Sequence, residues 1–439
     1  CEATANSVTG HVCVNSNKKM ALRMAGLSLM GVLLLSGCGN TGKSAVAAAS
    51  STSASETSNE AGKGTKVSQP AENVDAQVAE ASLPQPGEAI SASLTWESRM
   101  ELAYATQFAV DTYEDADGMQ YEAVSVADGS RFLLIPEGGK VPEDLPDSIQ
   151  VLKRPVKQIY LVATATMDMF RMLGALPDIR FSGTDASGWY IPEAKEAMEN
   201  GSILYAGKYS EPDYEMILEK GCQLAIESTM IYHTPDVKEM LEELGVPVLV
   251  DRSSYESNPL GRTEWIKLYG VLTGKETEAN AFFEKQQETV AAFDDYESTG
   301  KKAAFFYLTT DGKVVVRSTN DYVPSMIKMA GGSYAFEGVT DEDGKTSVSM
   351  TMESFYEKAQ DADYIIYNAS IDASVKTIAD LVEKDEVLKE FKAVKSGDCY
   401  TTGSSMYQRT DVIADMIADF HKVFTGQDTE HLEFLKKME

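Results

Sequence analysis

The chain contains few residues at the spacings that catalytic or metal chemistry requires. Gly331-Gly332-Ser333 lacks the Gly-x-Ser-x-Gly arrangement of an exposed nucleophilic serine, and no histidine follows it before His421. Only 4 histidines occur in the whole sequence, and no two cysteines have the spacing of a zinc site. These features argue against a hydrolase and against a receptor for bare metal cations.

Four basic residues are notable because the chain is strongly acidic, with a net charge of −29. They are Lys208, Arg252, Arg317 and Arg409. Basic side chains kept in so acidic a protein suit an anionic small molecule, although each could instead form a surface salt bridge. The same acidity excludes nucleic acid as a partner, because binding phosphates requires a basic face.

A cysteine at position 38 ends a segment typical of an export signal. Lys18, Lys19 and Arg23 precede an apolar run over 25–35, which is too short to remain as a membrane-spanning helix. The run ends in Leu-Ser-Gly-Cys, which resembles the lipobox of bacterial lipoproteins. That resemblance implies cleavage before Cys38 and a diacylglycerol thioether on its sulfur. We therefore assign residues 1–37 to a signal peptide with upstream residues, and Met20 is a candidate translation start.

Residues 38–92 are predicted to form a disordered tether between lipid and protein. They are rich in Ser, Ala, Thr, Glu and Gln and contain almost no aromatic residues, so they cannot bury enough apolar area to fold. Gly37 to Ser44 also matches the Gly-x-x-x-x-Gly-Lys-Ser phosphate-loop pattern. Because a signal segment precedes this match and low-complexity sequence follows it, we do not expect a nucleotide site.

Alternating apolar strands and helices predict two α/β lobes from residue 93 onward. Asp128-Gly129 indicates a hairpin between strands 119–126 and 131–135, whereas 101–112 suits either a helix or a strand. We divide the chain into an N-terminal α/β lobe at 93–260, connecting helices at 261–299 and a C-terminal α/β lobe at 300–439. The expected strands are 156–163, 179–182, 223–227, 246–250, 303–308, 314–317 and 363–367. The expected helices are 164–176, 192–199, 213–220, 235–244, 262–273, 276–296, 323–329, 352–359, 378–391 and 410–424. The predicted fold is two Rossmann-like lobes with parallel-type sheets, joined by the long helix 276–296.

The order of these elements resembles the type III substrate-binding proteins of ABC importers for ferric siderophores, haem and cobalamin. The resemblance covers about residues 155–425. The segments that resemble this family are Val156–Leu161, Tyr214–Leu218, Leu244–Val248, Leu272–Lys275, Ala330–Gly332, Met352–Phe355 and Ala393–Gly397. It implies a monomeric receptor without a cofactor, held by lipid on the outer face of the cell membrane. Such a receptor delivers a metal chelate to an ABC permease and its ATPase. A ferric siderophore is the leading ligand, with haem and cobalamin as alternatives.

The resemblance also implies roles for particular residues. One glutamate on each lobe of such receptors docks into arginine pockets of the permease, and the matching positions are Glu215 and Glu353. The ligand of such receptors lies between the lobes, against loops that follow strands. The candidate ligand-binding residues are Thr166, Trp189, Tyr190, Lys208, Tyr209, Tyr232, His233, Arg252, Arg317, Tyr322 and Arg409.

Two other classes of protein remain open at this stage. An exported α/β enzyme would need a catalytic set that the sequence does not display, and a surface adhesin or sensor domain could use the same fold. Cys222 and Cys399 are expected to be two separate buried thiols rather than a disulfide. Trp189 and Tyr190 could stack on a flat ligand or simply pack within the protein.

Overall fold

The computed structural model describes residues 81–293, 297–341 and 345–439. The predicted signal peptide, Cys38 and most of the predicted tether lie outside these residues. No helix of the described ranges is long and apolar enough to cross a membrane. The described strands form three large sheets and one two-stranded ribbon.

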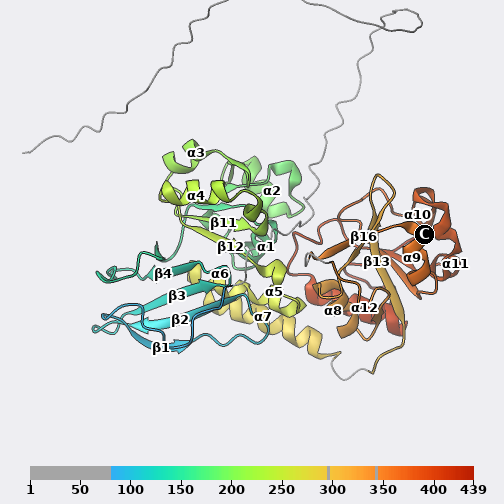
Figure 1. Ribbon diagram of the computed structural model, residues 1–439, viewed down its shortest axis with the longest axis horizontal. Coiled ribbons are helices and arrows are strands. Elements are labelled where there is room, and N and C mark those ends of the chain that lie inside the picture. The colour runs from blue at the N-terminus through green and yellow to red at the C-terminus, as the bar shows by residue number, and fades with distance from the viewer. Residues whose placement is uncertain (1–80, 294–296, 342–344) are drawn as a thin grey trace, which may run out of the picture. The chain divides into compact units, whose positions relative to one another are not determined.

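Five strands that precede the expected parallel region form a sheet of their own, which we call the N-terminal sheet (Figure 1). They are β1 (Thr95–Arg99), β2 (Phe108–Glu114), β3 (Gln120–Val126), β4 (Arg131–Ile135) and β5 (Ile149–Lys153). Neighbours are antiparallel except for the parallel pair β4 and β5. The predicted hairpin between β3 and β4 is confirmed, with Gly129 at a φ of +91° that favours glycine.

Alternate side chains of the N-terminal sheet belong to two different hydrophobic cores. Phe108 and Val124 face the main core, where the Phe108 ring packs edge-on against Trp265 at 5.0 Å. Tyr121 and Leu133 belong to a separate small core. The region predicted as one α/β lobe therefore carries an additional sheet before its parallel sheet begins.

The first lobe is built on a parallel sheet, as the alternation predicted. Its strands lie in the order β12 (Val248–Asp251), β11 (Leu224–Ser228), β6 (Ile159–Leu161), β7 (Ile179–Ser182) and β8 (Leu204–Tyr205). Its helices are α1 (Thr164–Met172), α2 (Pro192–Glu199), α3 (Tyr214–Glu219) and α4 (Pro235–Glu243), with one-turn helices η1 (Leu176–Asp178), η2 (Ala186–Gly188), η3 (Thr229–His233) and η4 (Ser253–Tyr255). A ribbon of β9 (Gly207–Lys208) and β10 (Glu211–Pro212) follows β8.

Three helices connect the lobes. The segment predicted as one helix at 262–273 is two helices, α5 (Pro259–Glu264) and α6 (Ile266–Thr273). The predicted long helix is α7 (Glu276–Ala291), which contacts α1 and α6 as well as α12 of the second lobe. Its 16 residues extend about 24 Å at about 1.5 Å per residue, less than predicted. Gly270 permits the close approach of α6 and α7, because a Cβ there would lie 2.7 Å from that of Ala279.

The second lobe contains a mixed sheet rather than a wholly parallel one. Its strands are β13 (Lys302–Leu308), β14 (Val314–Arg317), β15 (Ser333–Tyr334), β16 (Ser347–Met350), β17 (Tyr364–Tyr367), β18 (Cys399–Thr401) and β19 (Lys436–Lys437). β15, β17 and β18 continue the parallel pattern of β13, whereas β14, β16 and β19 pair antiparallel at the edges. Its helices are α8 (Tyr322–Met329), α9 (Met352–Ala359), α10 (Ile378–Lys384), η5 (Glu386–Glu390), α11 (Lys392–Ser396) and α12 (Ile413–Thr425). Cys222 and Cys399 are both free thiols, as expected, but only Cys399 is buried, whereas Cys222 is partly exposed.

Candidate ligand site between the two lobes

Loops at the carboxyl ends of parallel strands bring the two lobes into contact. In the first lobe α1 begins shortly after β6, and in the second lobe residues 402–411 follow β18. Thr410 Oγ1 donates to the carbonyl of Ala165 at 3.1 Å, and the Asp411 N–H donates to Asp168 Oδ2 at 2.9 Å. Ligands of open α/β folds bind at this edge of the sheets, so the contact region is the natural place for a site.

Two arginines and two aspartates form an ion cluster across this contact. Arg171 Nη2 lies 2.7 Å from Asp168 and 2.8 Å from Asp411, and Arg409 Nε lies 2.5 Å from Asp411. Burial, together with the nearby Asp411, raises the pKa of Asp168 to about 7. Burial also acts to raise the pKa of Asp411, but the hydrogen bond from Arg409 lowers it below its usual value. Arg409, predicted to bind ligand, is thus engaged in the contact between lobes.

Gln408 makes a second, uncharged bridge between the lobes. Its Oε1 accepts the N–H of Tyr190 at 2.8 Å, and its Nε2 donates to the carbonyl of Gly188 at 2.7 Å. The Trp189 side chain between them turns inward, is buried, and donates to Ser182 Oγ at 3.3 Å. Tyr190 is instead exposed, so of this predicted aromatic pair only Tyr190 presents its ring to solvent.

Two tyrosine rings and two arginines meet beside these bridges, and we call Arg262, Arg317, Tyr322 and Tyr407 the junction cluster. The guanidinium carbon of Arg262 lies 4.1 Å from the Tyr322 ring centre, which joins α5 to the start of α8. The guanidinium carbon of Arg317 lies 6.0 Å from the Tyr407 ring centre. Arg317 and Tyr407 lie near enough to the Tyr322 hydroxyl for their charges to affect its pKa, so two of the predicted ligand residues, Arg317 and Tyr322, are neighbours.

The two arginines of the junction cluster differ in how their charge is balanced. Arg317 forms a bidentate pair with Asp321, whose Oδ2 lies 2.7 Å away, and donates to Ser347 Oγ. Burial alone would lower the pKa of Arg317, but Asp321 raises it above its ordinary value. Arg262 has no acidic partner within the described residues, and its buried Nε has no hydrogen-bond acceptor there. Asn368 completes the region by donating to the Tyr407 hydroxyl at 2.8 Å.

Three of the predicted ligand residues are occupied in structural contacts of the first lobe. Thr166 is fully buried and donates to Asp251 at 2.7 Å. Arg252 is also buried, and donates to Gln107 Oε1 at 3.0 Å and to the Tyr232 hydroxyl at 3.2 Å. The Tyr232 hydroxyl in turn donates to Asp128 of the N-terminal sheet. Arg252 and Tyr232 thus hold the N-terminal sheet against the first lobe.

The other three predicted residues lie apart from the lobe contact. Lys208 pairs with Glu211 across the β9–β10 ribbon. Tyr209 is partly buried against a hydrophobic cluster of the first lobe that includes Tyr160 and Val248. His233 is exposed at the end of η3. In the described parts of the chain, none of the three makes a hydrogen bond or ion pair with the second lobe.

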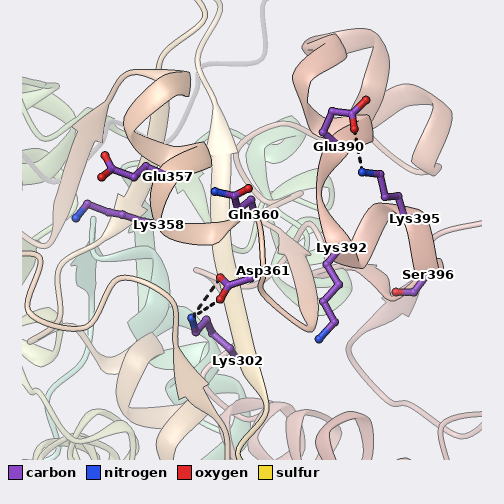
Figure 2. A pocket seen from close by; sticks show the side chains of 9 residues that line it. All are labelled: Lys302, Glu357, Lys358, Gln360, Asp361, Glu390, Lys392, Lys395 and Ser396. Carbon is purple, nitrogen blue, oxygen red and sulfur yellow. Dashed lines mark hydrogen bonds and ion pairs between the residues drawn. The ribbon is translucent and has the colours of Figure 1, made fainter.

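A surface depression of about 760 Å³ on the second lobe is less suited to a ligand (Figure 2). Its basic residues are largely matched by acidic neighbours, as with Lys302 and Asp361 at 3.2 Å and Lys395 and Glu390 at 2.9 Å. An open polar surface with compensated charges buries little of a small molecule. Across the described residues, no three His, Cys, Asp or Glu side chains are arranged to hold a metal ion.

Comparison with known proteins identifies the architecture. Residues 161–406, more than half of the chain, match the family described as periplasmic binding protein. The chain belongs to the periplasmic binding protein family. The match begins at the end of β6 and ends beyond β18, so it contains most of the sheet of each lobe and the helices that join the lobes. The N-terminal sheet of this periplasmic binding protein lies before the matched range.

Relatives of this periplasmic binding protein are distant in sequence. An uncharacterized lipoprotein of Methanocaldococcus jannaschii is 25% identical over 344 residues, which cover 73% of this chain and 80% of that protein. The solved structure of a periplasmic binding protein from Veillonella parvula has a TM-score of 0.51 at 16% identity, covering 73% of this chain and 99% of its own. A periplasmic haem-binding protein of Vibrio cholerae has a TM-score of 0.49 at 15% identity, covering 61% and 98%. The likeness to the Veillonella parvula structure shows a shared fold.

The two glutamates predicted to dock a permease occupy equivalent places on the two lobes of this periplasmic binding protein. Glu215 lies in the first turn of α3, before β11, and Glu353 lies in the first turn of α9, before β17. Both side chains are exposed. Each helix is capped, by Asp213 accepting from Met216 N–H and by Thr351 accepting from Ser354 N–H. The caps fix the direction in which each helix presents its glutamate.

Sequence reasoning missed Arg262 and Gln408. Both lie in loops or short helices that follow a strand, the same kind of position from which the other candidates were chosen. Arg262 could have been selected as a basic residue in the helix that follows β12, but the absence of a partner is visible only in three dimensions. Gln408 carries no charge and has no sequence signal of its own.

Proposed function

We propose that this protein captures a metal-chelate ligand between its two lobes and delivers it to an ABC permease. A ferric siderophore is the leading ligand, and haem or cobalamin are the next. The protein acts outside the cytoplasm while a lipid on Cys38 and the tether at 38–92 keep it near the permease. No covalent step is involved, because binding and release are the whole task.

The observation that carries this proposal is the junction cluster. It sets Arg317, Tyr322 and Tyr407 of the second lobe against Arg262 of the connecting helix α5, beside the contact between the lobes. Aromatic faces and guanidinium groups suit a large, flat or anionic chelate, because such a ligand needs both stacking area and polar contacts. The hydrogen bonds of Gln408 and the ion pairs of Arg171 are the contacts that must separate for a ligand to enter. Since α7 packs against elements of both lobes, we expect a small opening.

A binding panel tests the ligand class. The purified protein is titrated with haemin, cyanocobalamin, a ferric tris-catecholate and a ferric trihydroxamate, and complexes are detected by native mass spectrometry and tyrosine fluorescence. We expect a one-to-one complex with at least one of these chelates. Tight binding of a sugar or peptide, with no binding of any chelate, would contradict the proposal.

A double substitution tests delivery to a permease. Glu215→Ala with Glu353→Ala removes one exposed carboxylate from each lobe and is expected to abolish uptake while leaving ligand affinity unchanged, because charge-assisted contacts to arginines would be lost. The matched control is Glu219→Ala with Glu357→Ala, which removes exposed carboxylates from the same two helices. Normal uptake by the first double variant would reject the docking role.

Replacement of one cysteine tests the anchor. Cys38→Ala should leave the precursor uncleaved or the protein unanchored, whereas Cys222→Ala should be anchored normally. Membrane fractionation distinguishes the two results. Anchoring of the Cys38→Ala protein at the normal level would refute a lipid on this residue.

A further inference from the structure

We propose that Arg262 recognises an anionic oxygen group of the ligand, so that the protein selects anionic chelates over neutral ones. The inference rests on the proposed function and narrows its ligand class. The group recognised is a planar one with two oxygens, such as a carboxylate or a catecholate.

Arg262 differs from the other arginines of the described residues because it has no oxygen partner. Arg180 donates to backbone carbonyls, and Arg252 donates to an amide oxygen and a hydroxyl. The remaining described arginines pair with carboxylates, and they are Arg99, Arg131, Arg154, Arg171, Arg317 and Arg409. The chain has 68 acidic residues against 39 basic ones, so an arginine without a carboxylate partner is unusual here. An exposed arginine could rely on water, but the Nε of Arg262 is buried without an acceptor.

The surroundings of Arg262 leave its charge uncompensated. It lies over the Tyr322 ring, whose face attracts the cation but carries no formal charge to balance it. The nearby Arg317 is already neutralised by Asp321, and Arg171 and Arg409 are neutralised by aspartates. A buried donor without an acceptor is costly, and a ligand oxygen at this point would remove that cost.

The shape of the guanidinium narrows the ligand chemistry. Arginine presents donors in a planar fork that matches two oxygens of one planar anion. Because Tyr322 covers one face of Arg262, the edge of the fork is the part left for a ligand. A carboxylate or a catecholate fits that edge with both oxygens, whereas a chelate of zero net charge gains no ionic attraction from it.

The test compares four proteins against chelates of different charge. The proteins are the wild type, Arg262→Gln, Arg262→Lys and the control Arg131→Gln, which removes the same charge from the N-terminal sheet. Ferric citrate and haemin supply carboxylates, a ferric tris-catecholate supplies catecholate oxygens, and a neutral ferric trihydroxamate and cyanocobalamin supply neither charge. Dissociation constants are measured by fluorescence titration.

We expect the wild type to bind an anionic chelate, and Arg262→Gln to weaken that binding about 10- to 100-fold, the range for a lost charge-assisted contact. Arg262→Lys should lose less, because it keeps the charge but not the fork, and Arg131→Gln should stay within about twofold since surface pairs contribute little. If Arg262→Gln does not fold, Arg262→Lys decides the matter by a loss of affinity for the anionic chelate.

Two results would overturn the inference. Selective binding of a neutral chelate, or equal affinity in the wild type and the Arg262 variants, would remove the role of Arg262 and leave the proposed function standing. Binding of no chelate at all would remove both. If Arg262→Gln weakens the binding of ferric citrate and haemin, the group recognised is a carboxylate. If it weakens the binding of the tris-catecholate, the group is a catecholate.

Discussion

Two regions at the strand ends of the first lobe are held in opposite ways. The loops after β11 and β12 are fixed to the N-terminal sheet by buried side chains, including Arg252 and Glu256. The loops after β6 and β7 instead meet the second lobe through Gln408 and the partly buried ion pairs of Arg171 with Asp168 and Asp411. We call these regions the fixed half and the separable half.

Buried carboxylates make the fixed half permanent. Glu256 accepts hydrogen bonds from the backbone N–H groups of Thr106 and Gln107 and from the indole N–H of Trp265. Glu264 accepts hydrogen bonds from the backbone N–H groups of Ala103, Tyr104 and Ala105. Five consecutive backbone donors of the segment that enters β2 are therefore satisfied by two side chains. Separating them would leave charges and donors buried without partners, which is expensive.

Most charged groups of the separable half keep some contact with solvent. Arg171 is 20% exposed, Arg409 30% and Asp411 15%, so water can replace their hydrogen bonds once the lobes part, and the buried Asp168 then gains solvent. The difference indicates how a lobed receptor can keep a rigid frame and still admit a ligand. Under the proposed function, the fixed half would keep the lobe rigid and the separable half would open to admit a ligand.

The largest expected effect is on the fixed half. Glu256→Ala should lower the free energy of unfolding by at least about 3 kcal/mol, because several buried donors lose their acceptor at once. Urea denaturation followed by circular dichroism measures the change, and Glu243→Ala on the exposed end of α4 is the control. A loss below about 1 kcal/mol would show that the sheet is not held by this carboxylate.

A pH-dependent effect is expected at Glu227, which lies on β11 just before the fixed half. Its carboxyl is fully buried without a hydrogen-bond partner among the described residues, and burial raises its pKa well above the usual value. The folded protein therefore holds this proton at pH values where the unfolded chain releases it, so stability falls as pH rises above about 4.3.

Glu227→Gln cannot release that proton. Relative to wild type, its free energy of unfolding should gain up to about 1.4 kcal/mol per pH unit above about 4.3, until the folded-state pKa is reached. Denaturation at a series of pH values measures the slope. Parallel pH profiles for the two proteins would mean that Glu227 has no raised pKa.

The smallest effect on stability is expected in the separable half. Gln408→Ala removes two uncharged bonds between lobes and should lower the free energy of unfolding by less than about 1.5 kcal/mol. It should nevertheless speed ligand dissociation several-fold, because the closed arrangement is less favoured. Gln427→Ala, on the exposed turn after α12, is the control. A large loss in the free energy of unfolding of Gln408→Ala, with an unchanged rate of ligand dissociation, would contradict the distinction between the two halves.

Much of the two-lobed fold could be predicted from apolar periodicity. The strand 179–182 and the helices 192–199 and 352–359 coincide with β7, α2 and α9, because each has a local pattern and a clear boundary such as Pro192. The separate N-terminal sheet could not be predicted in the same way. Its attachment depends on Glu256 and Glu264, which bind backbone groups about 150 residues earlier in the chain.

Sequence reasoning indicated a region for a ligand site, but it could not indicate which residues make up the junction cluster. The candidate positions at the ends of strands include Arg317 and Tyr322, and both belong to the junction cluster. Composition made every arginine notable in an acidic chain, but it could not distinguish Arg252 from Arg262. Arg252 donates to Gln107 and Tyr232, whereas the Nε of Arg262 has no acceptor. That difference arises from partners distant in sequence.

Hydrogen–deuterium exchange with and without a bound chelate tests most directly whether the ligand lies between the lobes. The chelate used is the one bound most tightly in the panel of haemin, cyanocobalamin, ferric tris-catecholate and ferric trihydroxamate. We predict added protection at residues 188–190, 262–264 and 405–411, with no change in the second-lobe depression around Lys302 and Lys395. Protection confined to that depression, or to the N-terminal sheet, would contradict a ligand site at the junction cluster.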